Sequence, residues 1–350
     1  MGGAGPGRAR AGLTVSWVRD FLRKEPGDFF FGPVQYGDAT MPGTQRMPAT
    51  PVEPESAYLG LYLESMCISA VRVRSQAFYG SVTSTCALQS RSGQRAEVIA
   101  VSTPNSLRGV DPKHLDRVVV GTVPLVDAVP YRGGGLDVEI GLFAFPGGYL
   151  MGPYLDLLSD IATVASAFLP PAGALASTAL MPPVRKGLDL LFGAATDAHL
   201  EVGLAHTWQT PATGYYAVVR APEPPGGFRV GAGGYLLGPQ SSEVRAPHLI
   251  LRLDAQRERH NWAEIPDVYA AYQIVADAAR RGDLVAARDA LASFRRVAVF
   301  SPDLLIADGE RLHDKVAEQV KLAFPATGTS GGVTSPSFPD LTEIQLYERR

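Results

Sequence analysis

The chain has 350 residues, of which 46% are hydrophobic and 19% are charged. This length allows two or three domains, and the composition excludes a wholly disordered chain. The formal net charge of -3 provides no overall positive field that would attract nucleic acid or an anionic membrane, so nucleic acid is an unlikely partner.

Two cysteines, Cys67 and Cys86, are too few for a disulfide framework or a four-thiolate metal site. No apolar run characteristic of a secretory signal precedes residue 13, so we expect a cytoplasmic protein. Only five of the 32 basic residues are lysine, and alanine, glycine and proline are abundant. This composition is typical of GC-rich bacterial coding sequences, and we therefore expect a bacterial protein.

The first 56 residues are predicted to form a separate N-terminal region. Apolar residues at helical spacing predict a short helix over residues 13–24, which Pro26 and Gly27 end. An aromatic segment, residues 29–36, and a loop or linker over residues 38–56 follow. Loops on a rigid scaffold often carry recognition, so these two segments are the first places to look for a partner contact, although they could equally cover a sheet edge.

Residues 57–260 are predicted to form a β-rich domain, because short runs with period-two alternation are separated by Gly and Pro. The predicted strands cover residues 58–73, 80–89, 95–103, 117–126, 136–145, 199–208, 214–220, 228–237 and 248–254. Residues 80–89 and 95–103 should form a hairpin in which Cys86 faces inward with Val82 and Leu88. So many short strands without crossover helices favour an antiparallel β-sandwich or open barrel in an α+β protein.

Residues 154–196 interrupt this domain as a predicted helical insertion. Within it, residues 161–184 contain no ionisable side chain, and this run is long enough for one membrane-spanning helix. Pro170 and Pro171 divide the run into two shorter helices, and a third is predicted over residues 184–192. We expect the insertion to cover one face of the sheet. The alternative is a membrane-active hairpin that leaves the domain and inserts into lipid.

Residues 261–324 are predicted to form an antiparallel helical hairpin or bundle. Gly282 is suited to end the first helix and Asp283 to cap the second, while Pro302 is placed to open the third at its first position. Residues 325–350 are rich in Gly, Ser, Thr and Pro, which predicts a flexible tail.

Several short matches to catalytic motifs have simpler structural explanations. Residues 328–332 match the sequence around a trypsin-like nucleophile but lie in the predicted tail. His199 and Glu201 match the H-x-E of zinc deaminases without the later cysteine pair. Asp137 and Glu139 share one strand face, where alternation makes them solvent-side residues.

Glycine-rich segments do not predict a nucleotide site either. Residues 231–234 lack the third glycine and the following helix of a dinucleotide loop, and the chain has no P-loop motif. We therefore assign no catalytic residue, cofactor or metal ligand from the sequence.

The sequence thus favours a non-catalytic binding or scaffold protein that acts through protein–protein contacts. A membrane-active protein that inserts residues 161–184 is one alternative. A hydrolase with an unrecognised site, around His206, His248 or Asp254, is another. Partner identity, oligomeric state and biological process have no signal in the sequence.

Overall fold

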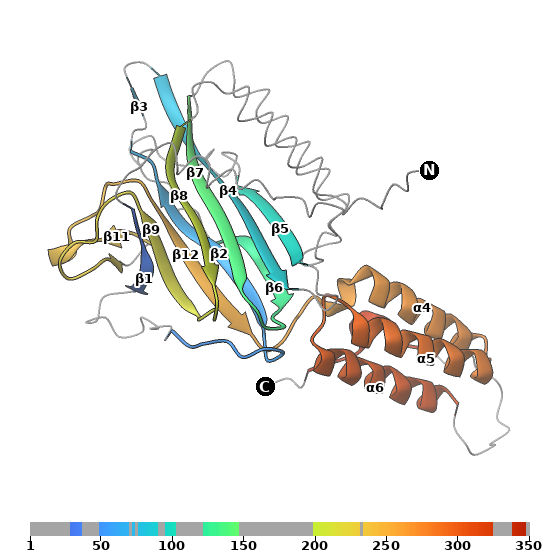
Figure 1. Ribbon diagram of the computed structural model, residues 1–350. Coiled ribbons are helices and arrows are strands. Elements are labelled where there is room, and N and C mark those ends of the chain that lie inside the picture. Colours follow the sequence, from blue (N-terminus) through green and yellow to red (C-terminus); the bar gives the residue numbers. More distant parts are fainter. Residues whose placement is uncertain are drawn as a thin grey trace, which may run out of the picture.

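A computed structural model of the chain describes residues 29–36, 49–69, 72–73, 76–89, 95–102, 122–146, 199–231, 234–324 and 338–347. The described residues form a mixed α+β protein (Figure 1). A curled seven-stranded sheet and a second sheet make a β-rich unit, and three helices lie together at one end of it.

The curled sheet has the strand order β11-β10-β1-β9-β12-β2-β6. Its strands are β1 (Phe30–Tyr36), β2 (Tyr58–Cys67), β6 (Val123–Pro130), β9 (Gly214–Val219), β10 (Arg229–Val230), β11 (Leu236–Leu237) and β12 (His248–Gln256). All neighbours in this sheet pair antiparallel except β1 and β10, which are parallel. The aromatic segment at residues 29–36 therefore lies within the sheet, between β9 and β10.

The second sheet has the order β3-β4-β7-β8, and β5 also pairs with β4. Its strands are β3 (Arg72–Val73), β4 (Gln76–Gln89), β5 (Arg95–Ser102), β7 (Leu136–Pro146) and β8 (His199–Trp208). Gln89 opposes Arg95, which confirms the predicted β4–β5 hairpin.

One hydrophobic core receives side chains from both sheets. The period-two alternation of β7 explains its contribution to this core. The residues between its buried positions lie on the opposite face of the strand, and the buried positions are Leu136, Val138, Ile140 and Leu142. Cys86 is buried with Val82 and Leu88, as predicted, and burial raises the pKa of its thiol to about 12.

Two predicted strands differ from the observed ones. Residues 228–237 form two two-residue strands, because the chain turns back through Gly231 and Gly234 between them. In place of residues 117–126, strand β6 runs from Val123 to Pro130, and residues 103–121 lie outside the described residues.

The helices are α4 (Pro266–Arg280), α5 (Leu284–Phe300) and α6 (Ile306–Ala323). Gly282 has a φ of 72°, a conformation that favours glycine, and the Asp283 side chain accepts a hydrogen bond from the backbone N–H of Ala286. Both predicted caps between α4 and α5 are thus confirmed. Apolar residues at helical spacing bury one face of each helix in a shared core.

The predicted start of the third helix at Pro302 is wrong, since α6 begins at Ile306. Arg132 donates hydrogen bonds to the carbonyl groups of Ser301, Pro302 and Leu304, and Arg259 donates to that of Asp303. Because these guanidinium groups occupy the carbonyls that a helix would use, residues 301–304 form a turn.

Residues 338–347, which lie inside the predicted flexible tail, pack against the helices; we call this segment the strap. Its buried side chains are those of Phe338, Leu341, Ile344 and Leu346. Pro339 accepts a hydrogen bond from the hydroxyl of Tyr272 in α4, at 2.6 Å. Asp340 and Glu343 form a reciprocal cap on a single 3-10 turn over Leu341–Glu343.

A buried polar cluster, which we call the junction, joins the β-rich unit to the helices. The carboxylate of Asp308 in α6 accepts hydrogen bonds from the hydroxyls of Tyr58 in β2 (2.6 Å) and Tyr347 in the strap (2.7 Å), and from Arg311 (2.7 Å). Arg259, with 1% of its side chain exposed, donates to the carbonyls of Ala128 and Asp303. The junction therefore links three parts of the chain that are distant in sequence.

The predicted helix over residues 13–24, the helical insertion over residues 154–196 with its uncharged run at 161–184, and the motif match at residues 328–332 all lie outside the described residues. Of the helices that the structure does describe, none combines the length and the apolar character needed to span a membrane.

Candidate functional site

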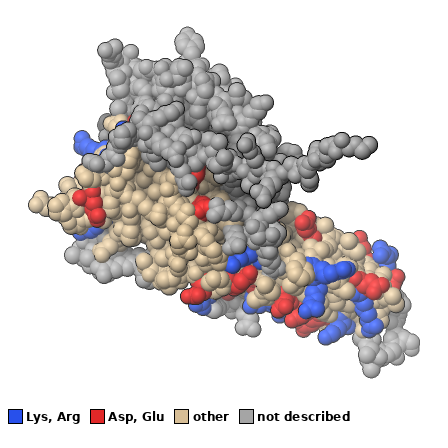
Figure 2. Space-filling model, in the orientation of Figure 1, with Lys and Arg blue, Asp and Glu red and all other residues tan. Residues whose placement is uncertain are grey.

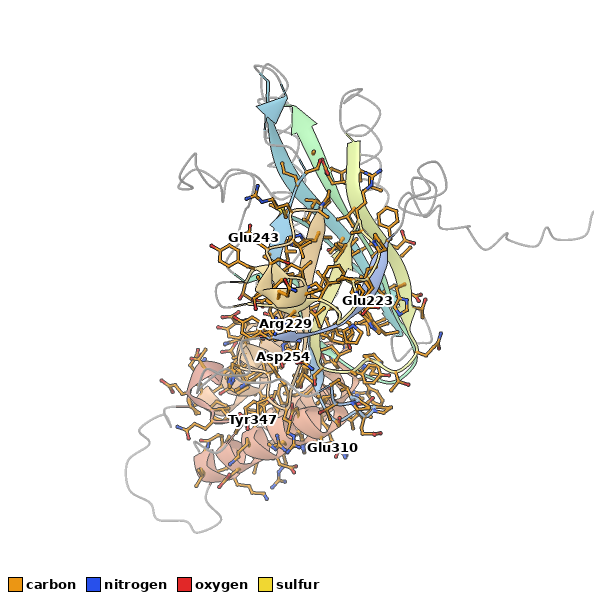
Figure 3. All side chains as sticks on the ribbon, turned by 90° about the vertical axis from the view of Figure 1, so that its left-hand side faces the viewer. Glu223, Arg229, Glu243, Asp254, Glu310 and Tyr347 are labelled. Atoms are coloured by element: carbon orange, nitrogen blue, oxygen red, sulfur yellow. The ribbon has the colours of Figure 1, made fainter. Side chains whose placement is uncertain are left out.

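The outer face of the curled sheet, turned away from the core between the sheets, carries a band of polar and aromatic side chains. On one side of this band, residues of β10, β11 and their connections build a small second core on the same face. In Figure 3, Asp254 lies between Arg229 and Glu243 of this region and Tyr347 and Glu310 of the strap and α6. The band thus lies between the small second core on one side and the strap and α6 on the other.

Strand register brings four residues of this face into one row. Arg252 in β12 lies directly opposite Tyr215 in β9 on one side and Tyr62 in β2 on the other. Tyr36, at the end of β1, stacks on Tyr215 with ring centroids 4.4 Å apart and an interplanar angle of 19°. We call Tyr36, Tyr215, Arg252 and Tyr62 the tyrosine–arginine row.

Arg252 is held in place by two carboxylates and one ring. Its Nε donates to Glu64 at 2.7 Å, and its Nη1 donates to Asp254 at 2.9 Å. The guanidinium carbon lies 4.3 Å from the centroid of the Tyr62 ring, which is a cation–π contact. Because these contacts fix the guanidinium group on three sides, the row has one defined geometry.

The Tyr62 side of the row is also fixed. Its hydroxyl donates to Asp127 in β6 at 2.8 Å, and its ring lies over Gly60. A Cβ atom at Gly60 would stand 2.5 Å from the Tyr62 ring, so glycine is required there for the ring to lie flat on the sheet. Tyr62 is only 8% exposed, whereas the side chains of Arg252 and Asp254 are 19% and 22% exposed.

Burial and charge shift the pKa values along the row. Burial, and then the hydrogen bond to Asp127, raise the pKa of Tyr62. Burial, and then the charge of Glu64, raise the pKa of Tyr215. Burial by itself lowers the pKa of Arg252. The hydrogen bond to Glu64 and the negative charge of Glu64 outweigh burial, so the pKa of Arg252 is raised overall. Tyr62 and Tyr215 are therefore neutral beside a charged Arg252 at neutral pH.

The residues named from the sequence as possible parts of an enzyme pocket do not meet. Asp254 flanks the row, but His248 lies six residues earlier in β12, roughly 20 Å away by strand geometry, and bonds to the carbonyl of Ala246. His206 belongs to the other sheet, where its ring contacts Phe31 and Trp208 and burial lowers its pKa. His206 and Trp208 share a strand face, as predicted.

Asp137 and Glu139 have the positions that alternation predicted, on the face of β7 opposite the core. Asp137 accepts a hydrogen bond from the hydroxyl of Thr207 at 2.5 Å. Among the residues that the structure describes, no three His, Cys, Asp or Glu side chains gather in a way that could hold a metal ion.

Sequence reasoning missed Arg252, Glu64 and Tyr62 as site residues. The sequence of β12 places His248, Arg252 and Asp254 on the face opposite Leu249, Leu251 and Leu253, but this alternation is ordinary for a strand buried on one face and did not mark a site. The partners come from β1, β2 and β9, and the sequence does not give the register that aligns them.

We compared the chain with protein-family models, with curated proteins and with solved structures, and none of the three comparisons finds a match. The geometry of the outer face is therefore the basis for a functional proposal.

Proposed function

We propose that this protein is a non-catalytic binding or scaffold protein, and that a protein partner docks on the tyrosine–arginine row. The observation that carries the proposal is the row itself. Its Tyr and Arg side chains, of which Tyr36, Tyr215 and Arg252 are partly exposed, are aligned across four strands and fixed by Glu64, Asp254 and Asp127. Tyr and Arg are enriched among the residues that dominate the energy of protein interfaces.

The rigidity of the row supports binding rather than chemistry. Side chains that are already immobilised lose little conformational entropy when a partner binds, which favours affinity. Arg252 engages both Glu64 and Asp254, so neither carboxylate is free to act as a general acid or base. The aromatic segment 29–36, expected from sequence to contact a partner, contributes Tyr36 to this face.

We extend the proposal to the architecture that presents the row. β5 contacts β6, and β8 contacts β9 and β12, so the two sheets approach each other at more than one edge. This supports an antiparallel sandwich or open barrel, with α4, α5 and α6 as an antiparallel helical appendage. A cytoplasmic location and a bacterial origin also remain proposals based on composition.

Site-specific photo-crosslinking in the native host tests the proposal. p-Benzoylphenylalanine placed at Tyr215 should give a discrete protein adduct, whereas the same residue at Tyr269, exposed on α4, should not. With the partner purified, Tyr36→Ser should weaken binding about tenfold or more without changing the melting temperature by more than a few degrees. The absence of an adduct at position 215, or an identical adduct at both positions, would contradict the proposal.

The two alternatives gain no specific support from the described residues. Membrane insertion depends on residues 161–184, which lie outside them, and stays a prediction. A hydrolase site would require His206, His248 or Asp254 to meet other catalytic groups, and these three are separated.

A further inference from the structure

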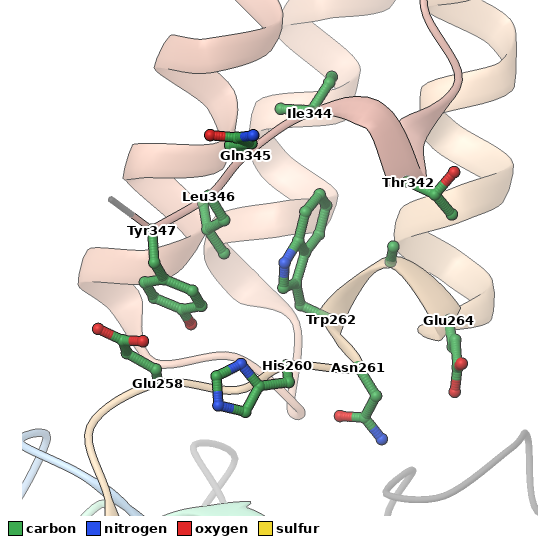
Figure 4. Close-up of a pocket in the computed structure, with 11 residues that line it drawn as sticks. Glu258, His260, Asn261, Trp262, Glu264, Thr342, Ile344, Gln345, Leu346 and Tyr347 are labelled. Carbon is green, nitrogen blue, oxygen red and sulfur yellow. The ribbon is translucent and has the colours of Figure 1, made fainter. Parts of the chain in front are cut away.

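A groove with a volume of about 720 Å³ lies away from the row, between the segment that leaves β12 and the strap (Figure 4). One wall comes from residues 258–264 and the other from residues 342–347. The two walls are about 80 positions apart in sequence, and the same packing that holds the strap on the helices forms the groove.

Aromatic side chains form the centre of the groove. In Figure 4, Trp262 rises from the wall of residues 258–264, and Leu346 of the strap lies between it and Tyr347. The hydroxyl of Tyr347 is already engaged by Asp308 and the backbone N–H of Arg259, and the guanidinium carbon of Arg311 lies 5.5 Å from the centroid of its ring. Only the part of the ring that lines the groove is therefore available to a ligand. Trp262 is only 6% exposed, and within the described residues its indole N–H has no hydrogen-bond acceptor. A ligand in the groove could supply that acceptor.

The groove also carries unbalanced negative charge. Glu258 and Glu264 line it, and neither forms an ion pair with any residue that the structure describes. No Lys or Arg is among the lining residues. This contrasts with the row, where Glu64 and Asp254 both form ion pairs with Arg252. Two carboxylates beside aromatic rings form a favourable environment for a guanidinium or ammonium group.

We propose that this groove is a second binding site, and that it takes an Arg- or Lys-containing peptide segment of a partner protein. A basic side chain would lie against the rings of Trp262 and Tyr347, between the carboxylates of Glu258 and Glu264. A peptide carbonyl would accept the indole N–H of Trp262. The proposal goes beyond the function assigned to the row, shares no residue with it and depends on neither its partner nor its chemistry.

Fluorescence anisotropy with defined peptides tests the proposal. The probe is a fluorescein-labelled hexapeptide of alternating Arg and Gly, and the comparison peptide carries citrulline, which keeps the shape of arginine and removes its charge. The arginine peptide should bind saturably, and the citrulline peptide at least about tenfold more weakly, a difference of about 1.4 kcal/mol.

The variant Glu258→Gln with Glu264→Gln should weaken binding of the arginine peptide about tenfold. The matched control is Glu310→Gln with Glu318→Gln, which removes two exposed carboxylates from α6 outside the groove and should bind as the parent does. Trp262→Phe, which keeps a ring but removes the N–H donor, should weaken binding severalfold.

Arg349 and Arg350, separated from the strap by Glu348 alone, are basic residues that would compete with the peptide for the groove. Each titration is therefore repeated with Arg349→Gln and Arg350→Gln present. No saturable binding in either background, or equal loss in the groove variant and the α6 control, would overturn the proposal. Either result would leave the crosslinking test of the row unaffected, so the two proposals can fail separately.

Discussion

The junction and the groove share residues of two segments, 258–264 and the strap, yet the polar side chains of these segments have opposite surroundings in the two places. Arg259 points into the junction, where it is 1% exposed and bonds to the carbonyls of Ala128 and Asp303. Its neighbours Glu258 and His260 line the groove. On one side of this extended segment, polar groups with hydrogen-bond partners join the β-rich unit to the helices. On its other side, the polar side chains face outward into the groove.

The charged surface shows a similar division. In Figure 2, blue and red side chains crowd over the helices, whereas the described part of the sheets in this view is mostly uncharged. In this view the charge is therefore concentrated on the helices, where it favours solubility. The following predictions test the contrast between junction and groove, beginning with the largest effect.

Replacing Arg259 should destabilise the protein most. Arg259→Met removes the donor from two carbonyls and the partner from Asp303 inside the junction, so the free energy of unfolding should fall by about 3 kcal/mol or more. Urea unfolding followed by circular dichroism measures the loss. Arg257→Met, two residues earlier and exposed, is the control and should change stability by less than about 0.5 kcal/mol. Equal effects of the two would show that the junction is not stabilising.

Gly309→Ala should lower the free energy of unfolding by about 1–3 kcal/mol, because the added methyl group displaces residue 309, which is next to Asp308. A Cβ at Gly309 would lie 2.4 Å from the carbonyl oxygen of Ala298 in α5, so α5 and α6 would have to separate. Thermal unfolding should show a lower melting temperature than for Ala307→Ser, an exposed change on the same helix turn. An unchanged melting temperature for Gly309→Ala would contradict the close approach of the two helices.

Tyr58→Phe should cost about 1–2 kcal/mol at neutral pH, because the hydroxyl bonds to Asp308. Burial, and then the charge of Asp308, raise the pKa of Tyr58 above its usual value near 10. As the pH rises, Tyr58 therefore loses its hydroxyl proton in the unfolded chain before it does in the folded chain. Its contribution to the free energy of unfolding is fully present below about pH 10 and falls above it by up to about 1.4 kcal/mol per pH unit.

Unfolding curves between about pH 9 and pH 11.5 should therefore be less steep in pH for Tyr58→Phe than for the parent. Tyr269→Phe, on the exposed face of α4, should keep the parent's dependence. Identical slopes for all three proteins would mean that Tyr58 does not stay protonated in the folded state.

The groove carboxylates should have the smallest effect on stability. Glu258→Gln with Glu264→Gln should change the free energy of unfolding by less than about 0.5 kcal/mol, since neither carboxylate has a cationic partner in the described ranges. Urea unfolding at low ionic strength checks this value. A loss comparable to that of Arg259→Met would make these residues part of the stabilising network instead of a binding site.

Local patterns predicted much of the fold. The alternation in β7, the hairpin of β4 and β5, and the caps at Gly282 and Asp283 each depend on neighbouring residues, and all are present. The start of α6 could not be predicted, because Arg132 and Arg259, both distant in sequence, bind the carbonyls of residues 301–304.

The candidate sites depend even more on long-range contacts. Asp254 was named from sequence, but its pairing with Arg252 has meaning only once β2 and β9 align Tyr62 and Tyr215 beside it. The strap was hidden because its buried apolar residues are spread through a segment rich in Pro, Gly and Ser, whose composition is typical of a flexible tail.

The shared carboxylate of Asp308 connects the strap to β2. Tyr347 and Tyr58 bond to the same oxygen atom, so a pulling force on the strap passes through one short linkage directly to β2 at the base of the curled sheet. A ligand that clamps the strap against residues 258–264 would add resistance along this path. A force applied to either end of the strap would thus reach β2 through Asp308.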